Sequence, residues 1–195
     1  MRVIAGKYKG RQIEAVSGKQ LRPTMGVARE ALFNILSHGR FLDGDKSFLE
    51  GCKVLDLFCG CGTLSIEALS RGAERVVLID IDQAHLNIAR ENLKSIGEEQ
   101  RATFIRADSS SPPPARFQCN LVFIDPPYHK DLASQALKSL IKGKWISEGA
   151  IVIVETGKTE DIFPPEGFVE LENRNYGNSR IRILEWMGTD KKDGL

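Results

Sequence analysis

The stretch KVLDLFCGCGTLSIEAL, residues 53–69, decides the fold of this chain. Its first part, KVLDLF, is an apolar run with the character of a buried strand, and TLSIEAL has the apolar spacing of a helix. Gly60 and Gly62 stand between the two and predict a tight turn that leads from strand to helix. In open α/β sheets such a turn lies at the carboxyl ends of the strands, where ligands bind.

The same alternation of strands and helices continues along the chain. We expect further strands at 75–80, 102–108, 120–125 and 150–156, and helices at 63–73, 83–97 and 130–144. Strands that alternate with helices of this length predict a mostly parallel sheet with helices on both faces. The last two apolar runs, within 168–186, flank Tyr176-Gly177-Asn178, which predicts an antiparallel hairpin.

The first forty residues are basic, whereas the rest of the chain is mildly acidic. They contain eight Lys and Arg against two Glu, so they carry +6 in a chain whose net charge is +1. RVIAG and RQIEAV predict a short hairpin across KYKG, and REALFNIL predicts an amphipathic helix. We therefore expect a basic N-terminal extension at 1–50, a main domain at 51–188 and a frayed tail at 189–195. The extension suits a polyanion partner, although a solvated basic surface would give the same pattern.

The composition excludes two classes of protein. No segment has the roughly 18 apolar residues of a membrane span, and the N-terminus lacks the hydrophobic region of a signal peptide. We therefore expect a cytoplasmic protein without a membrane partner. The four cysteines, at 52, 59, 61 and 119, and the three histidines are scattered, so we expect reduced thiols and no metal site.

The glycine turn does not have the spacing of a dinucleotide site. The third glycine place of that fingerprint is Ser65, which disfavours a nicotinamide-dependent oxidoreductase. An acid two residues before Phe58, followed by FxGxG, resembles instead motif I of S-adenosylmethionine-dependent methyltransferases. This resemblance implies that the turn passes the methionine part of the cofactor and that Asp56 organises its polar end.

Two further acids close predicted strands. Asp80 can accept two hydrogen bonds from ribose hydroxyls, and Asp108 stands where these enzymes hold the adenine amino group. An acid at a strand end is often only a helix cap, but beside a glycine turn the acids together predict an S-adenosylmethionine site. Its predicted residues are Asp56, Phe58, Cys59, Gly60, Gly62, Thr63, Leu64, Asp80, Ile81, Asp108 and Ser109.

A second motif, Asp125-Pro126-Pro127-Tyr128, follows the predicted strand at 120–125. Alone it would be an ordinary proline turn. In a doubly wound sheet, however, this strand lies next to the strand at 53–58, so we expect the motif to face the glycine turn. It matches the [DNS]PP[YFW] motif of amino-methyltransferases, which methylate exocyclic amines of nucleobases or amide nitrogens.

The residue types of this motif fit that chemistry. The lone pair of an aryl amine is delocalised into the ring, so the amine is a poor nucleophile. A carboxylate and the Pro126 carbonyl can accept its two N–H bonds and favour the pyramidal nitrogen that attacks a methyl group. The prolines fix the backbone, and Tyr128 offers a flat face for an extruded base. We therefore predict Asp125, Pro126, Pro127 and Tyr128 as the catalytic residues.

Over nearly its full length the chain resembles the RsmD family of bacterial 16S rRNA guanine-N2 methyltransferases. RVIAGKYKGRQI, LRPT with REALFNIL, and the two motifs above carry the resemblance. It implies a Rossmann-like class I methyltransferase fold: a seven-stranded, mostly parallel sheet with an antiparallel C-terminal hairpin, plus a small N-terminal extension of a β-hairpin and a helix. Asp80 stands where the family frequently has Glu, and Met25-Gly26-Val27 replaces a threonine, an acid and a basic residue.

The resemblance also implies the reaction and its partner. The enzyme would transfer the methyl group of S-adenosyl-L-methionine to the exocyclic N2 of one guanine in 16S rRNA, on the small ribosomal subunit. It would be a methyltransferase of the type that modifies guanine 966. The enzyme would act as a monomer. Its basic hairpin and signature helix would supply the RNA contacts, which are Arg2, Lys7, Lys9, Arg11, Arg22, Thr24 and Arg29.

Two other functions stay open. After Asp125-Pro126-Pro127-Tyr128 about 70 residues remain, and they are needed to complete the sheet. There is then no room for a DNA target-recognition domain, which favours RNA. The same motif also tolerates adenine N6 in RNA or DNA as the target. A non-catalytic RNA-binding assembly factor is the second alternative, although two intact motifs disfavour it.

Overall fold

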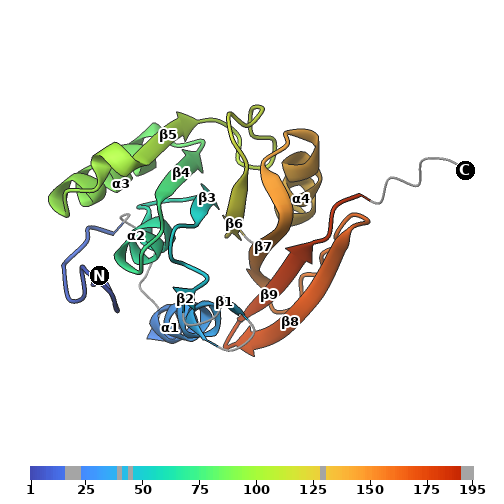
Figure 1. Cartoon of the computed structure of the whole chain (residues 1–195), viewed down its shortest axis with the longest axis horizontal. Coiled ribbons are helices and arrows are strands. Elements are labelled where there is room, and N and C mark those ends of the chain that lie inside the picture. The colour runs from blue at the N-terminus through green and yellow to red at the C-terminus, as the bar shows by residue number, and fades with distance from the viewer. Residues whose placement is uncertain (16–22, 39–40, 44–45, 128–130, 190–195) are drawn as a thin grey trace, which may run out of the picture. The chain divides into compact units, whose positions relative to one another are not determined.

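The computed structural model describes residues 1–15, 23–38, 41–43, 46–127 and 131–189. The helices in these residues are α1 Pro23–Ser37, α2 Thr63–Ser70, α3 Gln83–Ser95 and α4 Leu132–Lys142, and Glu99–Arg101 form a 3-10 turn. The strands are β1 Leu42–Asp43, β2 Lys46–Ser47, β3 Lys53–Leu57, β4 Arg75–Asp80, β5 Ala102–Arg106, β6 Cys119–Ile124, β7 Ile146–Gly157, β8 Phe168–Tyr176 and β9 Ser179–Trp186 (Figure 1). No helix among the described residues is long and apolar enough to cross a membrane.

Strands β3 to β9 form a seven-stranded sheet in the order β5-β4-β3-β6-β7-β9-β8. Strand β4 is parallel to β3 and β5, and β6 is parallel to β7. Strand β9 is antiparallel to both β7 and β8, and β8 forms the edge of the sheet. The predicted fold class, a mostly parallel sheet with an antiparallel C-terminal hairpin, is therefore confirmed.

Two strand boundaries differ from the prediction for reasons that lie in the backbone. Strand β3 ends at Leu57 because Phe58 has a φ of 60°, which is incompatible with a strand. Strand β7 begins at Ile146 and not at residue 150, since its register with β6 shifts along the way. Gly149, with a φ of 75°, lies in the extra stretch. An irregularity of this kind leaves no mark in the apolar pattern.

The chain forms two compact units, residues 1–109 and 110–195. The first unit contains the expected N-terminal extension, residues 1–50, together with β3, α2, β4, α3 and β5. Strands β3 and β4 are buried along nearly their whole length. Parallel strands covered on both faces carry apolar residues on both sides, which explains why KVLDL and RVVLI do not alternate with polar residues.

The second unit contains β6, α4, β7 and the β8–β9 hairpin. Helix α4 presents a fully buried apolar face of Ala133, Ala136, Leu137 and Leu140. The proline-rich loop before β6 is fixed to the segment that follows this helix, because the Trp145 indole donates a hydrogen bond to the Pro113 carbonyl at 2.8 Å. This proline-rich loop is therefore packed against the second unit.

The first fifteen residues form a short antiparallel arm, called the arm below. Arg2 and Gln12 are its one isolated β-bridge, and the Val3 amide donates to the Arg11 carbonyl at 3.0 Å. Val3 and Ile13 are its buried apolar anchors, each 2% exposed. The predicted hairpin is present, and backbone bonds also join Met1 to Ile13 and the Gly10 amide to the Val3 carbonyl. As a hairpin of only two strands it still depends on what it packs against.

The arm is docked on the C-terminal ends of α2 and α3. The Lys7 amide donates to the Ser70 carbonyl at 2.7 Å, and the Tyr8 amide donates to the Ser70 hydroxyl at 3.0 Å. A Cβ at Gly6 would stand 1.9 Å from the Ser70 carbonyl oxygen, so only glycine fits there. Beyond α3, the Glu98 carboxylate accepts hydrogen bonds from the Tyr8 hydroxyl and, at 3.3 Å, from the Lys7 ammonium.

Candidate functional site

The turn between β3 and α2 is held in an unusual backbone conformation by a distant side chain. Phe58 has a φ of 60°, a left-handed value that is costly for a bulky residue. Its amide donates to the Ser109 hydroxyl at 3.0 Å, and that hydroxyl donates to the Ile79 carbonyl at 3.0 Å. Ser109, predicted as a cofactor residue, therefore fixes the strand-to-turn corner and links it to β4.

The two glycines of the turn have different tasks. A Cβ at Gly62 would stand 3.0 Å from the Leu78 Cδ2 and 3.2 Å from the Ala89 Cβ, so Gly62 allows close packing against β4 and α3. A Cβ at Gly60 would meet nothing within 4 Å. Both have positive φ values, 52° at Gly60 and 75° at Gly62. Gly60 is thus the position where a ligand can approach the backbone.

Asp56 is directed into the fold of the turn. Asp56 is only 2% exposed. Its Oδ2 accepts hydrogen bonds from the Ser65 hydroxyl at 2.7 Å and from the Ser65 amide at 3.2 Å. The carboxylate thereby satisfies an otherwise unpaired amide in the first turn of α2. Ser65, which the sequence marks only as a missing glycine, is the partner that holds Asp56 in this orientation.

Asp80 joins the glycine turn to the start of α3. Its Oδ2 accepts from the Gly60 amide at 2.9 Å, and its Oδ1 accepts from the Asp82 amide at 2.9 Å. His85 Nδ1 lies 3.2 Å from the same Oδ2. His85 was not among the predicted residues, because a histidine five residues after an acid has no distinctive pattern. A carboxylate has about four acceptor positions, so Asp80 keeps capacity for ribose hydroxyls.

Two further predicted cofactor residues lie at the surface beside these groups. Ile81, directly after Asp80, is 67% exposed, which is unusual for a large apolar side chain. Asp108 is also exposed, two residues beyond the end of β5. An exposed apolar side chain between acids suits a ligand with a flat ring and polar edges.

Other predicted cofactor residues lie inside the turn. Burial raises the pKa of the Cys59 thiol, and the Asp56 and Asp80 carboxylates raise it further, so this thiol stays protonated. Cys61 is buried as well, with its sulfur 3.2 Å from the Thr63 hydroxyl. Thr63 and Leu64, the first two residues of α2, are half-buried. In the described part of the chain no group of three His, Cys, Asp or Glu side chains could hold a metal ion.

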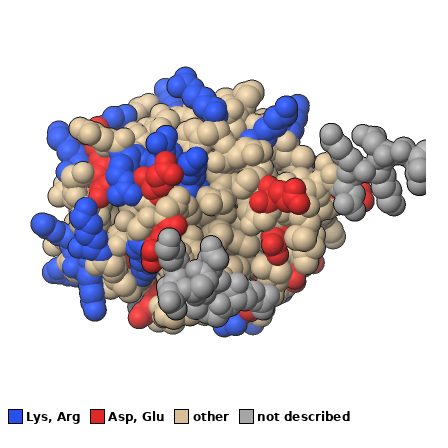
Figure 2. Space-filling view, viewed as in Figure 1, with Lys and Arg blue, Asp and Glu red and all other residues tan. Residues whose placement is uncertain are grey.

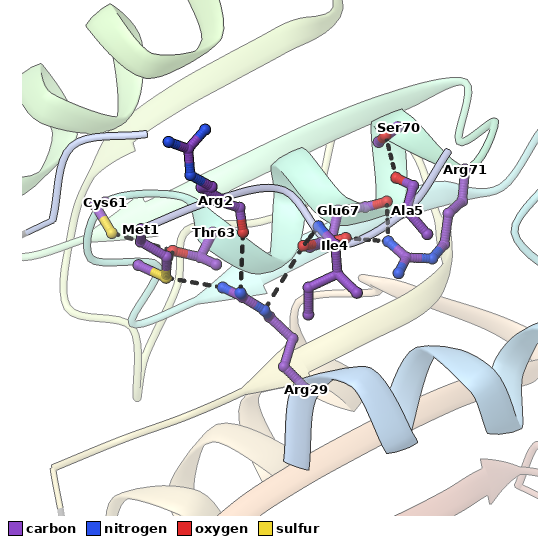
Figure 3. Close-up of polar contacts among 10 residues, drawn as sticks. All are labelled: Met1, Arg2, Ile4, Ala5, Arg29, Cys61, Thr63, Glu67, Ser70 and Arg71. Carbon is purple, nitrogen blue, oxygen red and sulfur yellow. Dashed lines mark hydrogen bonds and ion pairs between the residues drawn. The ribbon is translucent and has the colours of Figure 1, made fainter. Parts of the chain in front are cut away.

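A buried carboxylate next to this site holds three segments together (Figure 3). Glu67, on α2, has a fully buried side chain and accepts from the Ile4 amide at 2.7 Å. It forms ion pairs with Arg71, one helical turn later, and with Arg29 of α1, whose Nε lies 3.7 Å from Oε1. Arg29 also donates to the Arg2 carbonyl at 3.2 Å. The Arg29 side chain is only 12% exposed, so its contacts face the protein.

The other predicted RNA contacts are distributed differently. Arg2, Lys7, Lys9 and Arg11 are all exposed. In Figure 2, Lys and Arg side chains gather at the left, where Figure 1 shows the N-terminal segment and α3. Arg22 lies outside the described residues, and Thr24 lies in the first turn of α1.

The second unit carries the proline motif. Asp125 directly follows β6 and is half-buried, Pro126 is buried and Pro127 is exposed. Tyr128 lies outside the described residues. Since neither proline has an N–H group, the backbone here offers only carbonyl acceptors after the Asp125 amide. A carboxylate followed by carbonyl acceptors is suited to bind the N–H groups of an amine.

The chain is similar to known methyltransferases over nearly its full length. The chain matches the protein family described as Conserved hypothetical protein 95 over residues 1–185. It is 31% identical to ribosomal RNA small subunit methyltransferase D of Haemophilus influenzae, over 95% of this chain and 93% of that protein. A Haemophilus influenzae methylase of known crystal structure has a TM-score of 0.78 at 29% identity, over 96% of this chain and 99% of that chain. A Salinibacter ruber RNA methyltransferase, solved with S-adenosyl-L-homocysteine, shares the fold with a TM-score of 0.61 at 17% identity, over 86% of this chain and 95% of that chain.

Proposed function

The chain belongs to the family described as Conserved hypothetical protein 95, and we propose that it methylates the exocyclic N2 amine of one guanine in 16S rRNA. The resemblance to the RsmD family is confirmed by the match to ribosomal RNA small subunit methyltransferase D, so the chain is a member of a family of S-adenosylmethionine-dependent methyltransferases. The observation that carries the proposal is the pairing of two features. One is the Gly60 turn fixed by Asp80, and the other is Asp125-Pro126-Pro127, which directly follows β6.

S-adenosylmethionine fits the residues around the glycine turn. When bound, this group supplies an electrophilic methyl group on its sulfonium. The open side of Gly60 leaves the backbone accessible to the methionine part, Asp80 can accept from the ribose hydroxyls, and Ile81 can contact the adenine ring. We assign Asp108 to the adenine amino group and Asp56 to holding the turn in shape through Ser65.

The acceptor amine would be bound by the second unit. We propose that the Asp125 carboxylate and the Pro126 carbonyl each accept one N–H of the guanine amine, which localises the lone pair on nitrogen. The buried ring of Pro126 fixes the carbonyl direction without a competing donor. We further propose that Tyr128 stacks on the extruded base.

The RNA backbone would be bound by the exposed arm residues. Lys7, Lys9 and Arg11 lie within five residues of each other on a docked segment and are all exposed, so we propose that they form one basic surface. Lys7 also pairs with the Glu98 carboxylate, at 3.3 Å. Phosphate contacts of this kind give affinity and position the RNA but do not select a base.

The test is methyl transfer from labelled S-adenosylmethionine to small-subunit particles whose rRNA lacks the modification, followed by mapping of the labelled nucleotide. We expect label in guanine N2. Label in adenine N6, or label in DNA offered in parallel, would overturn the choice of target. Binding of S-adenosylmethionine without transfer to any substrate would favour a non-catalytic assembly factor.

A pair of variants tests the role of the proline motif. Asp125→Ala should reduce transfer by about a hundredfold to a thousandfold, a typical loss when a group that stabilises the transition state is removed. Its affinity for S-adenosylmethionine should stay within a few fold. Asp161→Ala is the matched control, because it removes an acid that is 71% exposed in the same unit. Transfer at the unmodified rate by Asp125→Ala would show that this carboxylate is not catalytic.

A further inference from the structure

One buried asparagine is bonded to both the arm and the glycine turn. Asn92 lies on α3 and is 4% exposed. Its Oδ1 accepts from the Glu14 amide at 2.8 Å, and its Nδ2 donates to the Glu14 carbonyl at 2.9 Å and to the Cys61 carbonyl at 3.0 Å. Both N–H donors and the oxygen acceptor of the side-chain amide are thus used.

The bond on the turn side is to the peptide between the two functional glycines. The Cys61 carbonyl belongs to the peptide that continues into Gly62, and Gly62 in turn donates its amide to the Cys59 carbonyl at 2.9 Å. Asn92 therefore restrains the section of backbone that leads from Gly60 into α2. Gly60 is the residue that Asp80 holds from the other direction.

The bonds on the arm side fix the last part of the arm. The arm is a two-stranded hairpin that belongs to neither sheet, so its position depends on the side chains that receive it. Glu67 binds the Ile4 amide near the start, as Figure 3 shows, Ser70 binds the middle, and Asn92 binds Glu14 at the end. Of these three, Asn92 is the one that also bonds the turn. A terminal segment outside the main sheet undocks at a lower free energy than the core.

We propose that Asn92 is a positioning residue that couples docking of the arm to the shape of the glycine turn. RNA held by the basic surface of the arm and S-adenosylmethionine held by the turn then bind with positive cooperativity. This inference rests on the proposed function, since it takes these two ligands from it. RNA favours the docked arm because docking fixes the basic side chains, and the docked arm keeps Asn92 oriented toward Cys61. The coupling is reciprocal, as any coupling between two binding equilibria must be.

The experiment measures a coupling factor and not an affinity alone. The affinity for S-adenosyl-L-homocysteine, which cannot react, is measured by calorimetry without and with a saturating 16S rRNA transcript. For the unmodified protein we expect the affinity to rise about fivefold or more with RNA, the lower end of ordinary coupling between sites. For Asn92→Ala we expect a ratio close to one. A residue that only stabilised the fold would lower both affinities and leave their ratio unchanged.

The matched control is Asn87→Ala, which removes the same side chain from the exposed face of the same helix. It should keep the ratio of the unmodified protein. A second pair covers the case in which Asn92→Ala does not fold. Glu14→Pro removes the amide that donates to Asn92 and fixes the backbone φ at this position, and it should lower the ratio. Glu14→Ala also removes the glutamate side chain but keeps the backbone bonds, and it should not lower the ratio.

The possible failures are distinguishable. A ratio of one in the unmodified protein, or an unchanged ratio in both Asn92→Ala and Glu14→Pro, would overturn the coupling while leaving the proposed function intact. Failure of the unmodified protein to bind S-adenosyl-L-homocysteine at all would overturn the proposed function, and the inference with it.

Discussion

Two groups of basic residues in the first unit have the same charge but opposite surroundings. Arg29 and Arg71 flank the buried Glu67 carboxylate, with side chains 12% and 9% exposed. Lys9 and Arg11, on the arm, are exposed. The first group holds the arm and α1 to α2, and the second leaves its charge available for a partner. The basic residues of this unit therefore include structural cations, which are buried in ion pairs, and binding cations, which are exposed. The two kinds can be told apart only by their burial.

The separation has an energetic basis. A buried carboxylate loses the solvation of water and must be compensated by charges and hydrogen bonds within the protein. Glu67 receives both, from two guanidinium groups and the Ile4 amide. Burial lowers the pKa of Arg29, and the Glu67 carboxylate opposes this by raising it. An exposed lysine on the arm keeps its hydration until a partner displaces it. Substitutions in each group test this division.

Removal of the central carboxylate should have the largest effect on stability. Glu67→Ala leaves two buried cations without their counter-ion, and breaking a buried ion pair typically costs about 3–5 kcal/mol. Urea denaturation followed by circular dichroism measures the loss. The control is Glu74→Ala, which removes a carboxylate 45% exposed and should change the free energy of unfolding by less than about 1 kcal/mol. Equal effects of the two substitutions would contradict the distinction between buried and exposed pairs.

Removal of a structural cation should have a smaller effect on stability and none on the salt dependence of RNA binding. Arg29→Ala deprives Glu67 of one partner and the Arg2 carbonyl of its donor, which should cost about 1–3 kcal/mol. Binding of a 16S rRNA transcript over a series of salt concentrations tests the second part. The Arg29 side chain was predicted as an RNA contact, and a salt dependence that becomes less steep would support that prediction against the structural role.

Removal of the exposed arm cations should leave stability almost unchanged and weaken the salt dependence of RNA binding. The double variant Lys9→Ala/Arg11→Ala should leave the free energy of unfolding within about 0.5 kcal/mol. The logarithm of its RNA affinity should fall less steeply with the logarithm of salt concentration, by roughly 0.7–0.9 for each phosphate that the variant no longer neutralises. Lys138→Ala/Lys158→Ala removes the same charge from exposed positions in the second unit and serves as the control. An unchanged slope in the arm variant would remove the arm from the interface.

The smallest expected effect is on the pH dependence of stability, through Glu98. Burial alone would raise the pKa of Glu98, but hydrogen bonds from Tyr8, Lys7 and Arg101 outweigh it and hold the pKa below its ordinary value. Because the ionised form is favoured in the folded chain, its contribution to stability is present above the ordinary carboxyl pKa of about 4.3 and disappears as the pH falls through the lower, folded value. Urea denaturation between pH 7 and pH 3 should show Glu98→Gln less stable than the unmodified protein at pH 7, and the difference should shrink in acid. A stability difference that stays constant between pH 7 and pH 3 would contradict the lowered pKa of Glu98.

Much of the fold was predictable because it depends on local patterns. The change from an apolar run to helical spacing across Gly60 and Gly62 identified β3, the turn and α2, and the strand that ends at Asp80 followed the same logic. Strand β5 ends at Arg106, two residues before the predicted end at Asp108. Parallel strands buried on both faces also produce continuous apolar runs, which are easily seen in a sequence.

Residues whose partners lie far away in the chain could not be predicted. Glu67 meets the Ile4 amide across 63 residues, and Asn92 meets Glu14 across 78. No local spacing indicates such pairs. Ser65 stands out in the sequence only because it is not a glycine, yet it is the donor that orients Asp56. The N-terminal arm was expected to carry charge, and its second task, the link to the glycine turn through Asn92, is visible only in three dimensions.

Strand β8 has a consequence for behaviour at high protein concentration. It lies at the edge of the sheet, where unpaired backbone groups invite a strand from another molecule. Glu170, Glu172 and Arg174 place charges along this strand, and a register shift interrupts its pairing with β9 between the first two of them. Behind it, β9 carries the buried apolar residues Ile181, Ile183 and Leu184 together with the charged residues Arg182 and Glu185. The charges on β8 protect the edge of the sheet from pairing with another molecule, so substitutions that make β8 apolar should favour polymerisation before they affect methyl transfer.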